Sequence, residues 1–310
     1  MSVGAAITGW GGALPANIVT NEDYSNRLDT TDEWIRERTG IRERRIGGTT
    51  GALSIEAGRE AIECSGVDPG TIELLVLCTT TPDQTMPANA VDVHHTLGLS
   101  GGAYDLNAAC AGFVYGLFAG YGALATGALS RVLVIGSDTM STIVDQTERS
   151  TAVLFGDGAG AVVLESIPGE DRFLSWDLGV DGTARSILQA DHGGYVTMEG
   201  KEVFRRAVRV TVESATAALE RAKCTPDDIA MFIPHQANVR IIEAAAQRIG
   251  IPDGHTAVAM ERTGNTSAAS IPLALTEVAQ AGHLHAGDLV LLSGFGAGMS
   301  WGSAVIRWGS

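Results

Sequence analysis

Cys110 is the residue of this sequence best suited to nucleophilic chemistry. It lies in the segment DLNAACAGFVYG, where an apolar strand predicted over residues 103–106 runs into a helix rich in glycine and alanine. At a helix N-terminus, unpaired N–H groups and the positive end of the helix dipole lower the pKa of a thiol and favour the thiolate. A cysteine among alanines is as often only a small buried residue. The segment alone therefore leaves both interpretations open.

His235 and Asn265 lie in two loops that could supply polar groups to one site. His235, in MFIPHQANVRI, follows a predicted strand and precedes a helix that opens at Asn238. The carboxyl end of a strand is where α/β proteins place reactive groups. Asn265, in RTGNTSAAS, leads into the next helix, and Gly264 beside it permits an unusual backbone angle. Taken singly, both residues would more often be loop hydrogen-bonding groups than catalysts.

No metal site or disulfide is predicted. Cys64, Cys78 and Cys224 form no CxxC pair, and we interpret them as structural residues. The histidines other than His235 lack carboxylate or cysteine partners at metal-ligand spacing. This use of cysteine fits a reducing, cytoplasmic setting.

Three glycine-containing segments imitate known motifs in the wrong structural context. Gly156, Gly158 and Ala161 fit G-x-G-x-x-A, yet a dinucleotide site needs a following helix, and AVVLES is typical of a strand. The segment GFGAG at 294–298 fails for the same reason. The segment GLSGG at 98–102 matches G-x-S-x-G, but it follows a helix and precedes a strand, the reverse of a nucleophile elbow. The two glycine clusters therefore predict tight turns where backbone approaches closely.

Strands and helices are predicted to alternate along the chain. Short runs rich in Val, Ile and Leu alternate with Ala-rich segments of helical periodicity, which predicts an α/β fold. The predicted strands cover residues 3–9, 74–79, 103–106, 131–136, 160–165, 229–233, 289–293 and 303–307. The predicted helices cover residues 53–65, 88–97, 110–126, 202–222, 239–249 and 267–281.

The order of these elements indicates an internal duplication. A helix after Cys110 leads to the strand RVLVIGS, a glycine loop and the strand AVVLES, and a helix after Ser267 leads to DLVLLSG, a glycine loop and SAVIRW. Two such halves predict a layered sandwich of helices and sheets. The N-terminal half, residues 1–166, would carry the cysteine, and the C-terminal half, residues 167–310, the histidine and the asparagine. No linker rich in Pro and Ser separates them, so we expect one fused body.

Length, charge and hydropathy exclude several classes of protein. At 310 residues and 45% hydrophobic content, the chain can bury a large core without disulfide or metal support. A formal net charge of -15 argues against a nucleic-acid binder, which needs a clustered basic surface. The N-terminus lacks the features of a secretory signal. Residues 108–129 are uncharged and long enough to span a bilayer, but they are weakly apolar, so a helix packed inside the protein is predicted instead.

Five segments together resemble the β-ketoacyl-acyl carrier protein synthase III family, the initiating condensing enzymes of type II fatty-acid synthesis. They are DTTDEWIRERTGIRERR, DLNAACAGF, LFGDGAGAVVL, IPHQANVRI and GNTSAAS, and the resemblance extends from about Ile7 to Arg307. It implies the thiolase fold, a duplicated five-layer α-β-α-β-α sandwich, and a homodimer. It also implies that acyl-CoA and malonyl-acyl carrier protein are the substrates and that no cofactor is needed.

The resemblance implies roles for the three candidate residues. Cys110 would take an acyl group from acyl-CoA and carry it as a thioester. His235 and Asn265 would donate hydrogen bonds to the malonyl thioester oxygen while CO2 is lost and the new carbon–carbon bond forms. The backbone N–H groups of Cys110 and Ala297 would hold the tetrahedral oxyanion. The family usually has glycine at the latter position, but a main-chain donor survives the change.

Binding surfaces for the two substrates are also implied. The adenine of CoA would stack between Trp34 and Arg149, and Asn238 would bond the pantetheine arm. The complete set of implied CoA-binding residues is Thr30, Trp34, Arg38, Arg149 and Asn238. An acidic carrier protein needs a local basic patch on this acidic enzyme, and the family docks its carrier protein on the corresponding helix. The implied docking residues are Lys201, Arg205 and Arg209, spaced four apart, with Arg240 and Arg248 on another helix; such a stripe is otherwise usually a solvated face.

The acyl primer is left open by two departures from the family pattern. The resemblance assigns Met86 and Phe295 to the acyl pocket, and Met86 stands where many members have an aromatic residue that crosses the dimer interface. A flexible methionine could admit a longer or branched chain, and residues 180–198 form a shorter segment than in bacterial fatty-acid enzymes. A priming ketosynthase of a polyketide pathway is therefore an alternative. A non-condensing acyltransferase or thioesterase is a further one, against which the presence of Asn265 argues.

Overall fold

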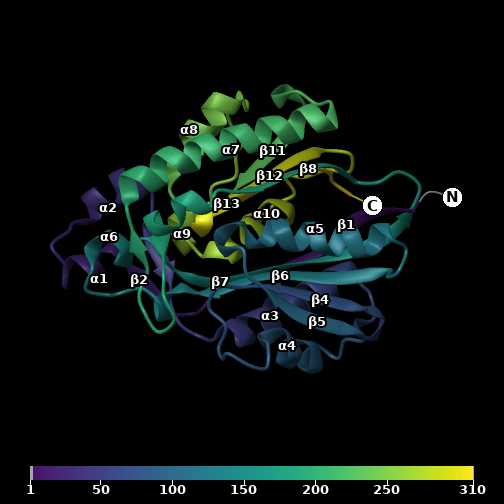
Figure 1. Cartoon of the computed structure of the whole chain (residues 1–310), viewed down its shortest axis with the longest axis horizontal. Helices are drawn as coiled ribbons and strands as arrows, with labels where there is room; N and C mark the ends of the chain where they lie inside the picture. The colour runs from purple at the N-terminus through teal and green to yellow at the C-terminus, as the bar shows by residue number, and fades with distance from the viewer. Residues whose placement is uncertain (1–2, 310) are drawn as a thin grey trace.

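Two mixed β-sheets form the framework of the protein (Figure 1). The structure, a computed structural model, describes residues 3–309. The first sheet has the order β1 (Val3–Ala13), β7 (Asp157–Pro168), β6 (Arg131–Thr139), β4 (Leu74–Cys78) and β5 (Gly102–Leu106). The second has the order β11 (Ile229–Pro234), β12 (Leu289–Gly296), β13 (Ser300–Arg307) and β8 (Phe173–Val180).

The two sheets share one strand pattern. In the first, β4 is parallel to β6, β6 is antiparallel to β7, and β7 is antiparallel to β1. In the second, β11 is parallel to β12, β12 is antiparallel to β13, and β13 is antiparallel to β8. The first sheet adds β5 at the free edge of β4. The described strands of the first sheet end at Pro168, and those of the second begin at Phe173.

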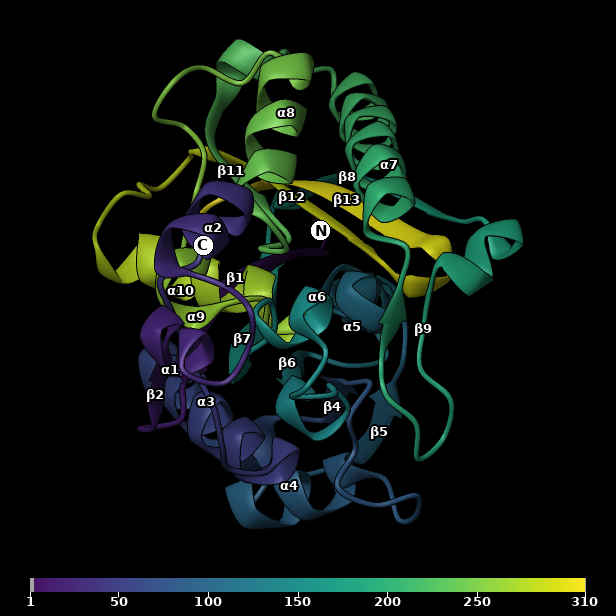
Figure 2. The same ribbon diagram turned by 90° about the vertical axis from the view of Figure 1, so that its left-hand side faces the viewer.

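Helices cover the sheets in three layers, which makes five layers in all (Figures 1 and 2). One outer layer packs on the first sheet and holds α3 (Thr50–Ser65) and α4 (Asn89–Leu97). The central layer contacts both sheets and holds α5 (Gly112–Ala125) and α10 (Ser270–Gln280). The other outer layer lies over the second sheet and holds α7 (Gly200–Ala222) and α8 (Val239–Ile249). The predicted α/β class and the predicted five-layer sandwich are confirmed.

Glycines let the central helix α5 approach the first sheet closely. A Cβ added at Gly116 would lie 2.3 Å from the Cys78 sulfur, and one at Gly120 would lie 3.0 Å from the Leu164 side chain. Both distances are too short for a substituted residue, so the glycine spacing along α5 sets the distance between helix and sheet. The prediction that residues 108–129 contain a packed helix is thus confirmed. Within residues 3–309, no helix has the length and apolar character needed to cross a bilayer.

Short elements surround the layers and were not predicted. They are α1 (Asn21–Ser25), α2 (Asp32–Thr39), α6 (Arg149–Ala152), α9 (Met260–Thr263), β2 (Ile18–Thr20), β3 (Glu43–Arg45), β9 (Leu188–Gln189) and β10 (Thr197–Met198). Several of these small elements lie together at one end of the molecule in Figure 1, near the carboxyl ends of the parallel strands.

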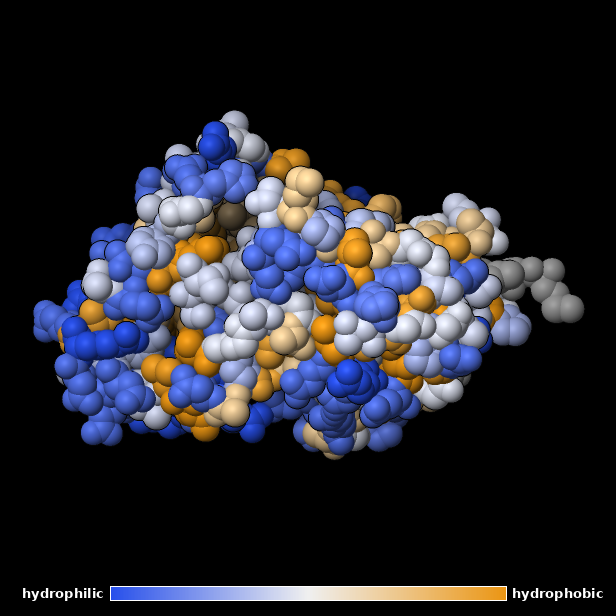
Figure 3. Space-filling view, turned by 90° about the horizontal axis from the view of Figure 1, so that it is seen from below, coloured by the Kyte–Doolittle hydropathy of each residue, from blue (hydrophilic) through white to orange (hydrophobic). Residues whose placement is uncertain are grey.

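The face seen in Figure 3 mixes hydrophilic residues with separate hydrophobic groups.

Candidate active site

One cavity of about 770 Å³ brings the three predicted catalytic residues together. Cys110, His235 and Asn265 all line it, together with residues of α7, α8 and the turn after β12. Its wall is mostly apolar, with side chains that include Met140, Ile143, Leu154, Phe155, Leu188, Val196, Met198, Phe204, Ile241 and Phe295. The residues come from loops of both sheets, so the fold assembles a site that no single segment contains.

Cys110 lies in a 3-10 turn, Ala109–Ala111, between β5 and α5. Ala109 has a φ of 49°, a left-handed conformation that turns the chain sharply at the end of the strand. The end of β12 packs directly on this turn, because a Cβ added at Gly296 would lie 2.6 Å from the Cys110 backbone nitrogen. The predicted close backbone approach at this glycine cluster is therefore confirmed.

Burial, not the helix N-terminus, decides the charge state of Cys110. The residue is 9% exposed, and burial raises the pKa of its thiol to about 12, opposed by a hydrogen bond from the Ser267 hydroxyl. That hydroxyl lies 3.4 Å from the Cys110 sulfur. The predicted position before a helix is correct, but the predicted lowering of the thiol pKa is wrong, because the desolvation cost of a thiolate outweighs the local stabilisation. The resting sulfur is a neutral thiol.

His235 follows β11 and is also held neutral by burial. It is 1% exposed, and burial lowers the pKa of its imidazole to about 3. Its Nδ1 atom lies 2.6 Å from the Ser270 hydroxyl oxygen, and its ring packs edge-on against Phe295 at a centroid distance of 5.1 Å. Its backbone N–H donates to the Ser293 carbonyl, which ties the loop to the neighbouring strand. With Nδ1 engaged, Nε2 is the ring nitrogen available to a substrate.

Asn265 is oriented by the turn that follows it. Its Oδ1 accepts a hydrogen bond of 2.9 Å from the Ser267 backbone N–H, so its Nδ2 group is left to donate. Its own backbone N–H donates to the Leu154 carbonyl, which joins the loop to the segment before β7. Gly264 has a φ of 66°, and a Cβ there would lie 2.8 Å from the Arg44 side chain, so the predicted need for glycine is confirmed.

Asp138 at the end of β6 fixes the asparagine loop to the cysteine half of the molecule. The residue is fully buried, and its Oδ2 accepts a hydrogen bond from the Ala268 backbone N–H at 3.0 Å. Its Oδ1 accepts from the hydroxyl or backbone groups of Thr79, Thr80 and Thr81. Asp138 was not predicted from the sequence, although the polar run SDT at the end of a predicted strand was a usable signal.

Ala297 lies in the turn Ala297–Met299 that follows β12 and lines the same cavity as Cys110. This turn is joined to the loop after β8 by two backbone hydrogen bonds between Asp181 and Met299. The structure therefore places Ala297 in the same cavity as Cys110, directly after Gly296, which packs on the Cys110 backbone. The donor role itself stays a prediction.

Trp34, Arg38 and Arg149 gather near the cavity, but the gap between Trp34 and Arg149 is closed. The guanidinium of Arg149 lies 4.8 Å from the Trp34 ring centroid, and that of Arg38 lies 5.1 Å from it. Two groups that sandwich a base must lie roughly 7 Å apart, twice the contact distance of about 3.5 Å. Arg149 must therefore move for the predicted adenine stacking. The Thr30 hydroxyl nearby is buried with no hydrogen-bond partner among the described residues.

Asn238 lines the cavity and caps α8. Its Oδ1 accepts from the Arg240 backbone N–H, and its Nδ2 donates to the Arg38 carbonyl at 2.9 Å. This second bond joins α8 to α2, the helix that carries Trp34. The predicted contact between Asn238 and a pantetheine arm would compete with it.

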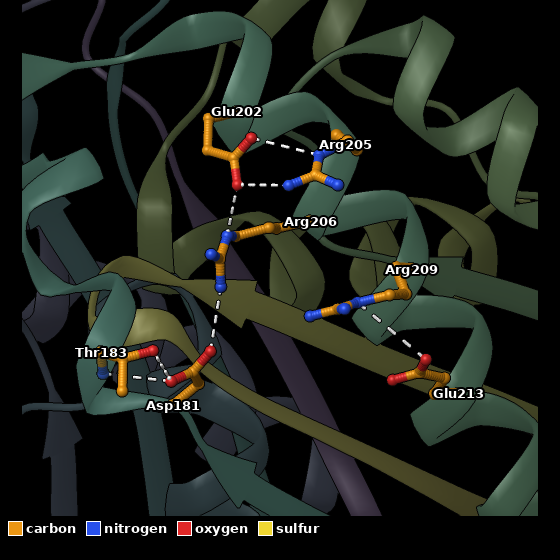
Figure 4. Close-up of polar contacts among 7 residues, drawn as sticks. All are labelled: Asp181, Thr183, Glu202, Arg205, Arg206, Arg209 and Glu213. Atoms are coloured by element: carbon orange, nitrogen blue, oxygen red, sulfur yellow. Dashed lines mark hydrogen bonds and ion pairs between the residues drawn. The ribbon is translucent and has the colours of Figure 1, made fainter.

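The predicted basic stripe on α7 is exposed but partly neutralised (Figure 4). Arg205 makes two hydrogen bonds with Glu202, and Arg206 bridges Glu202 and Asp181. Arg209 lies 4.0 Å from Glu213. The prediction of one exposed helical face is confirmed, but the sequence analysis missed the carboxylates that share this face.

The other predicted docking and pocket residues fall in different environments. The helices α7 and α8 present exposed Lys201, Arg240 and Arg248, and the Arg240 guanidinium lies 5.8 Å from the Phe204 ring. Phe295 is 4% exposed and lines the cavity. Met86 is 83% exposed and does not line the cavity of its own chain. Its predicted place in the acyl pocket of a partner stays a prediction.

Comparisons with known proteins find relatives over nearly the whole chain. Family models described as 3-oxoacyl-[acyl-carrier-protein (ACP)] synthase III and its C-terminal part match residues 104–182 and 219–308. The chain is 47% identical to β-ketoacyl-[acyl-carrier-protein] synthase III 5 of Streptomyces coelicolor, over 99% of this chain and 98% of that protein. The crystal structure of 3-oxoacyl-[acyl-carrier-protein] synthase III from Aquifex aeolicus is similar with a TM-score of 0.96 at 41% identity, over 98% of this chain and 100% of that one. The priming β-ketosynthase of the R1128 polyketide pathway is similar with a TM-score of 0.95 at 37% identity, over 98% and 96%.

Proposed function

The chain belongs to the β-ketoacyl-[acyl-carrier-protein] synthase III family, an acyltransferase family of condensing enzymes, and from that premise we propose how its residues carry out the reaction. One observation carries the proposal: Cys110, His235 and Asn265 line one cavity, with His235 Nδ1 and Asn265 Oδ1 already hydrogen-bonded to Ser270 and Ser267. The pathway we propose is the initiation of fatty-acid synthesis.

In the first step, the Cys110 sulfur attacks the thioester carbon of an acyl-CoA. A bond forms between sulfur and the acyl carbon, the bond to the CoA sulfur breaks, and the thiol proton leaves with CoA. Because the two sulfurs have similar basicity, the exchange costs little free energy. The proton has to leave as the new bond forms, because burial keeps the resting thiol neutral. The Ser267 hydroxyl stabilises the charge that develops on sulfur.

In the second step, a malonyl thioester on the carrier protein takes the place of CoA. The His235 Nε2–H and Asn265 Nδ2–H groups donate to its thioester oxygen, CO2 leaves, and the electron pair forms an enolate. The enolate carbon attacks the acyl group on Cys110, the carbon–sulfur bond breaks as the ketoacyl product forms, and the departing thiolate takes up a proton from water to restore the resting thiol. The backbone N–H groups of Cys110 and Ala297 hold the oxyanion of this attack. A neutral imidazole suits this donor role in a buried site. An imidazolium there would need a carboxylate beside it to balance its charge, and a neutral ring does not.

The substrates enter over α2 and α7. CoA adenine binds at Trp34 after Arg149 moves away, and this is supported by the two guanidinium groups beside the indole. The acidic carrier protein docks on Lys201, Arg205 and Arg209 of α7, with Arg240 and Arg248 of α8 at the side. The exposure of these residues supports the docking. A cytoplasmic location fits both substrates.

We also propose a homodimer formed along β5. This strand is the edge of the first sheet, so its outer backbone groups can pair with another strand. Tyr104 on β5 is 39% exposed, Val91 on α4 is 45% exposed, and Phe118 on α5 is 44% exposed. These exposed hydrophobic side chains support an interface on this side, from which Met86 would reach the acyl pocket of the partner.

The proposal is tested by mass spectrometry of the intact protein after incubation with acyl-CoAs and then with malonyl-acyl carrier protein. We expect an acyl adduct that maps to Cys110 and then disappears as a ketoacyl carrier protein forms. Cys110→Ala should form no adduct. An adduct that is lost only as free acid or to another acceptor would favour a thioesterase or a non-condensing acyltransferase.

A polyketide-priming role is the second candidate, with the same chemistry and a different primer. Its support is the full-length similarity to the R1128 priming ketosynthase, together with the flexible Met140 and Met198 in the cavity wall. The same acyl-CoA panel separates the two. A preference for acetyl or short branched primers favours fatty-acid synthesis, and a preference for longer primers favours the polyketide role.

A further inference from the structure

One short turn places two serine hydroxyls against the two reactive groups of the site. Ser267 and Ser270 are 1% and 2% exposed, so neither side chain is exposed to bulk solvent. The Ser267 hydroxyl donates to the Cys110 sulfur at 3.4 Å. The Ser270 hydroxyl lies 2.6 Å from His235 Nδ1. The two serines are three residues apart, at the junction of the asparagine loop and α10.

The hydrogen-bond partners of Ser270 favour one tautomer of His235. The Ser270 oxygen accepts the backbone N–H of Gln236 at 3.3 Å, so its own hydrogen is free to be donated. Given to Nδ1, that hydrogen makes Nδ1 an acceptor and leaves the proton of a neutral imidazole on Nε2. Gln236 is itself fixed, because its side chain bonds the Pro234 and Ala257 carbonyls and the Ala259 backbone N–H. The hydrogen bonds that link Gln236, Ser270 and His235 are thus anchored by fixed backbone groups.

Ser267 donates hydrogen bonds to the Cys110 sulfur and to Asn265 from two different groups, its hydroxyl and its backbone N–H. Its φ of 51° places it in the left-handed region, and this conformation turns its backbone N–H toward Asn265 Oδ1 while its hydroxyl meets Cys110. A change to alanine removes only the hydroxyl, so the bond that orients Asn265 survives.

We propose that the two serines divide the half-reactions: Ser267 assists acylation by donating to the attacking sulfur, and Ser270 is a positioning residue that holds His235 as the Nε2–H donor for decarboxylation. The inference rests on the proposed function and extends it to residues outside the three reactive side chains. The titratable groups near the sulfur are His235, which lines the same cavity, and the buried carboxylate of Asp138, whose charge acts on the thiol. Ser267→Ala changes neither of them.

Ser270→Ala and Ser267→Ala are expected to give opposite patterns. We expect Ser270→Ala to self-acylate at nearly the wild-type rate and, once acylated, to release CO2 about 10- to 100-fold more slowly, since the imidazole can then present either tautomer. We expect Ser267→Ala to acylate about tenfold more slowly near neutral pH, with its pH–rate profile moved to higher pH, because the developing thiolate loses a donor. After complete acylation it should release CO2 at the wild-type rate.

Thr276→Val is the matched control, because Thr276 is a buried hydroxyl on the same helix that donates to the Gly11 carbonyl on β1. Both half-reactions should be unchanged in this variant. Equal slowing of both half-reactions in each serine variant would overturn the division of roles. A wild-type enzyme with neither an adduct on Cys110 nor condensation would instead count against the proposed function itself.

Nitrogen NMR of the ¹⁵N-histidine protein tests the positioning role without any assay of activity. The His235 signals, identified by their loss in His235→Gln, should show an unprotonated Nδ1 and a protonated Nε2 in the wild type. Ser270→Ala should show a mixture of tautomers. A wild type with its proton on Nδ1 would overturn the role of Ser270, even if the variant proved too unstable to study.

Discussion

At the scale of single residues, burial sets the chemistry of this site. Burial raises the pKa of Cys110 to about 12 and lowers that of His235 to about 3, so the resting pair is a neutral thiol and a neutral imidazole. A neutral imidazole donates without carrying charge, which suits the stabilisation of an enolate. The thiol has to lose its proton during attack, and Ser267 is placed to assist that loss.

The buried histidine makes a testable contribution to stability. Its pKa is lowered from 6.5 to about 3 in the folded protein, so between these values the unfolded chain binds more protons. The free energy of unfolding should therefore fall as pH decreases through this window, by up to about 1.4 kcal/mol per pH unit from this residue. In His235→Gln, urea unfolding followed from neutral to acidic pH should show a correspondingly smaller slope. Equal slopes in both proteins would contradict a neutral buried imidazole.

The sequence allowed the reactive residues to be predicted better than their surroundings. Cys110, His235 and Asn265 stand in long, specific segments, and the structure brings all three to one cavity. Asp138, Ser267 and Ser270 were missed, because their roles depend on partners that are distant in sequence. The direction of the Cys110 pKa shift was predicted wrongly for a related reason: helix position is local, whereas burial arises from packing of both halves.

At the scale of elements, hydrophobic periodicity predicted the long helices and every strand of the two main sheets except β8, but not the short elements around them. The strand β8 has only two buried positions, Phe173 and Ser175, and its remaining residues, which include Asp177, are half-exposed or exposed, so its apolar signal is weak. The short helix α2 carries the predicted CoA-binding Trp34 and has a mostly polar sequence. Elements this short owe their structure to capping and tertiary contacts, which periodicity does not report.

Substitution of Trp34 on α2 should affect acyl-CoA and not malonyl-acyl carrier protein. We expect Trp34→Ala to raise the KM for acyl-CoA roughly tenfold, since it removes a stacking and cation-π surface. Steady-state kinetics should show an unchanged KM for malonyl-acyl carrier protein. Arg36→Ala is the control, because Arg36 lies on the same helix and pairs with Asp32. Equal effects of the two substitutions on acyl-CoA would argue against adenine binding at Trp34.

Removing the charge of Arg205 and removing the charge of Glu202 on α7 should have opposite effects on the binding of malonyl-acyl carrier protein. Arg205→Gln should weaken binding of malonyl-acyl carrier protein, whereas Glu202→Gln should strengthen it, because it frees Arg205 and Arg206 from their shared partner. Each change should be a few-fold in KM and should shrink at high salt. Arg221→Gln, near the other end of the helix and paired with Asp177, is the control. A loss of affinity in Glu202→Gln would contradict this competition.

At the scale of the whole molecule, the duplicated order of strands was predictable from the order of motifs. In the two sheets, which share one parallel and antiparallel pattern, the end of β6 packs on the asparagine loop and the end of β12 packs on the cysteine turn, and this loop and this turn contact each other. We propose that the halves divide near residue 166. The convergence of three loops could not be derived from periodicity alone, because it depends on how the two sheets pack against the central helix layer from its two sides.

The exposed edge strand β5 of the first sheet leads us to expect a dimer in solution. We expect sedimentation at micromolar concentration to give a dimer, and Tyr104→Lys on β5 to shift it toward monomer, since the charge would be buried against the partner. Ile18→Lys is the control, because Ile18 is a comparably exposed hydrophobic residue on β2, outside the first sheet. A dimer unaffected by Tyr104→Lys would place the interface elsewhere.

The central claim is that one sulfur carries the acyl chain while an amide and an imidazole stabilise the enolate. Asn265→Ala tests it most directly when both half-reactions are measured on the same preparation, acylation by intact mass and decarboxylation by CO2 release. We predict that self-acylation of Cys110 stays close to the wild-type rate and that CO2 release falls about 100-fold or more. Equal loss of both steps, or undiminished CO2 release, would contradict the assigned role of the asparagine and with it the proposed mechanism.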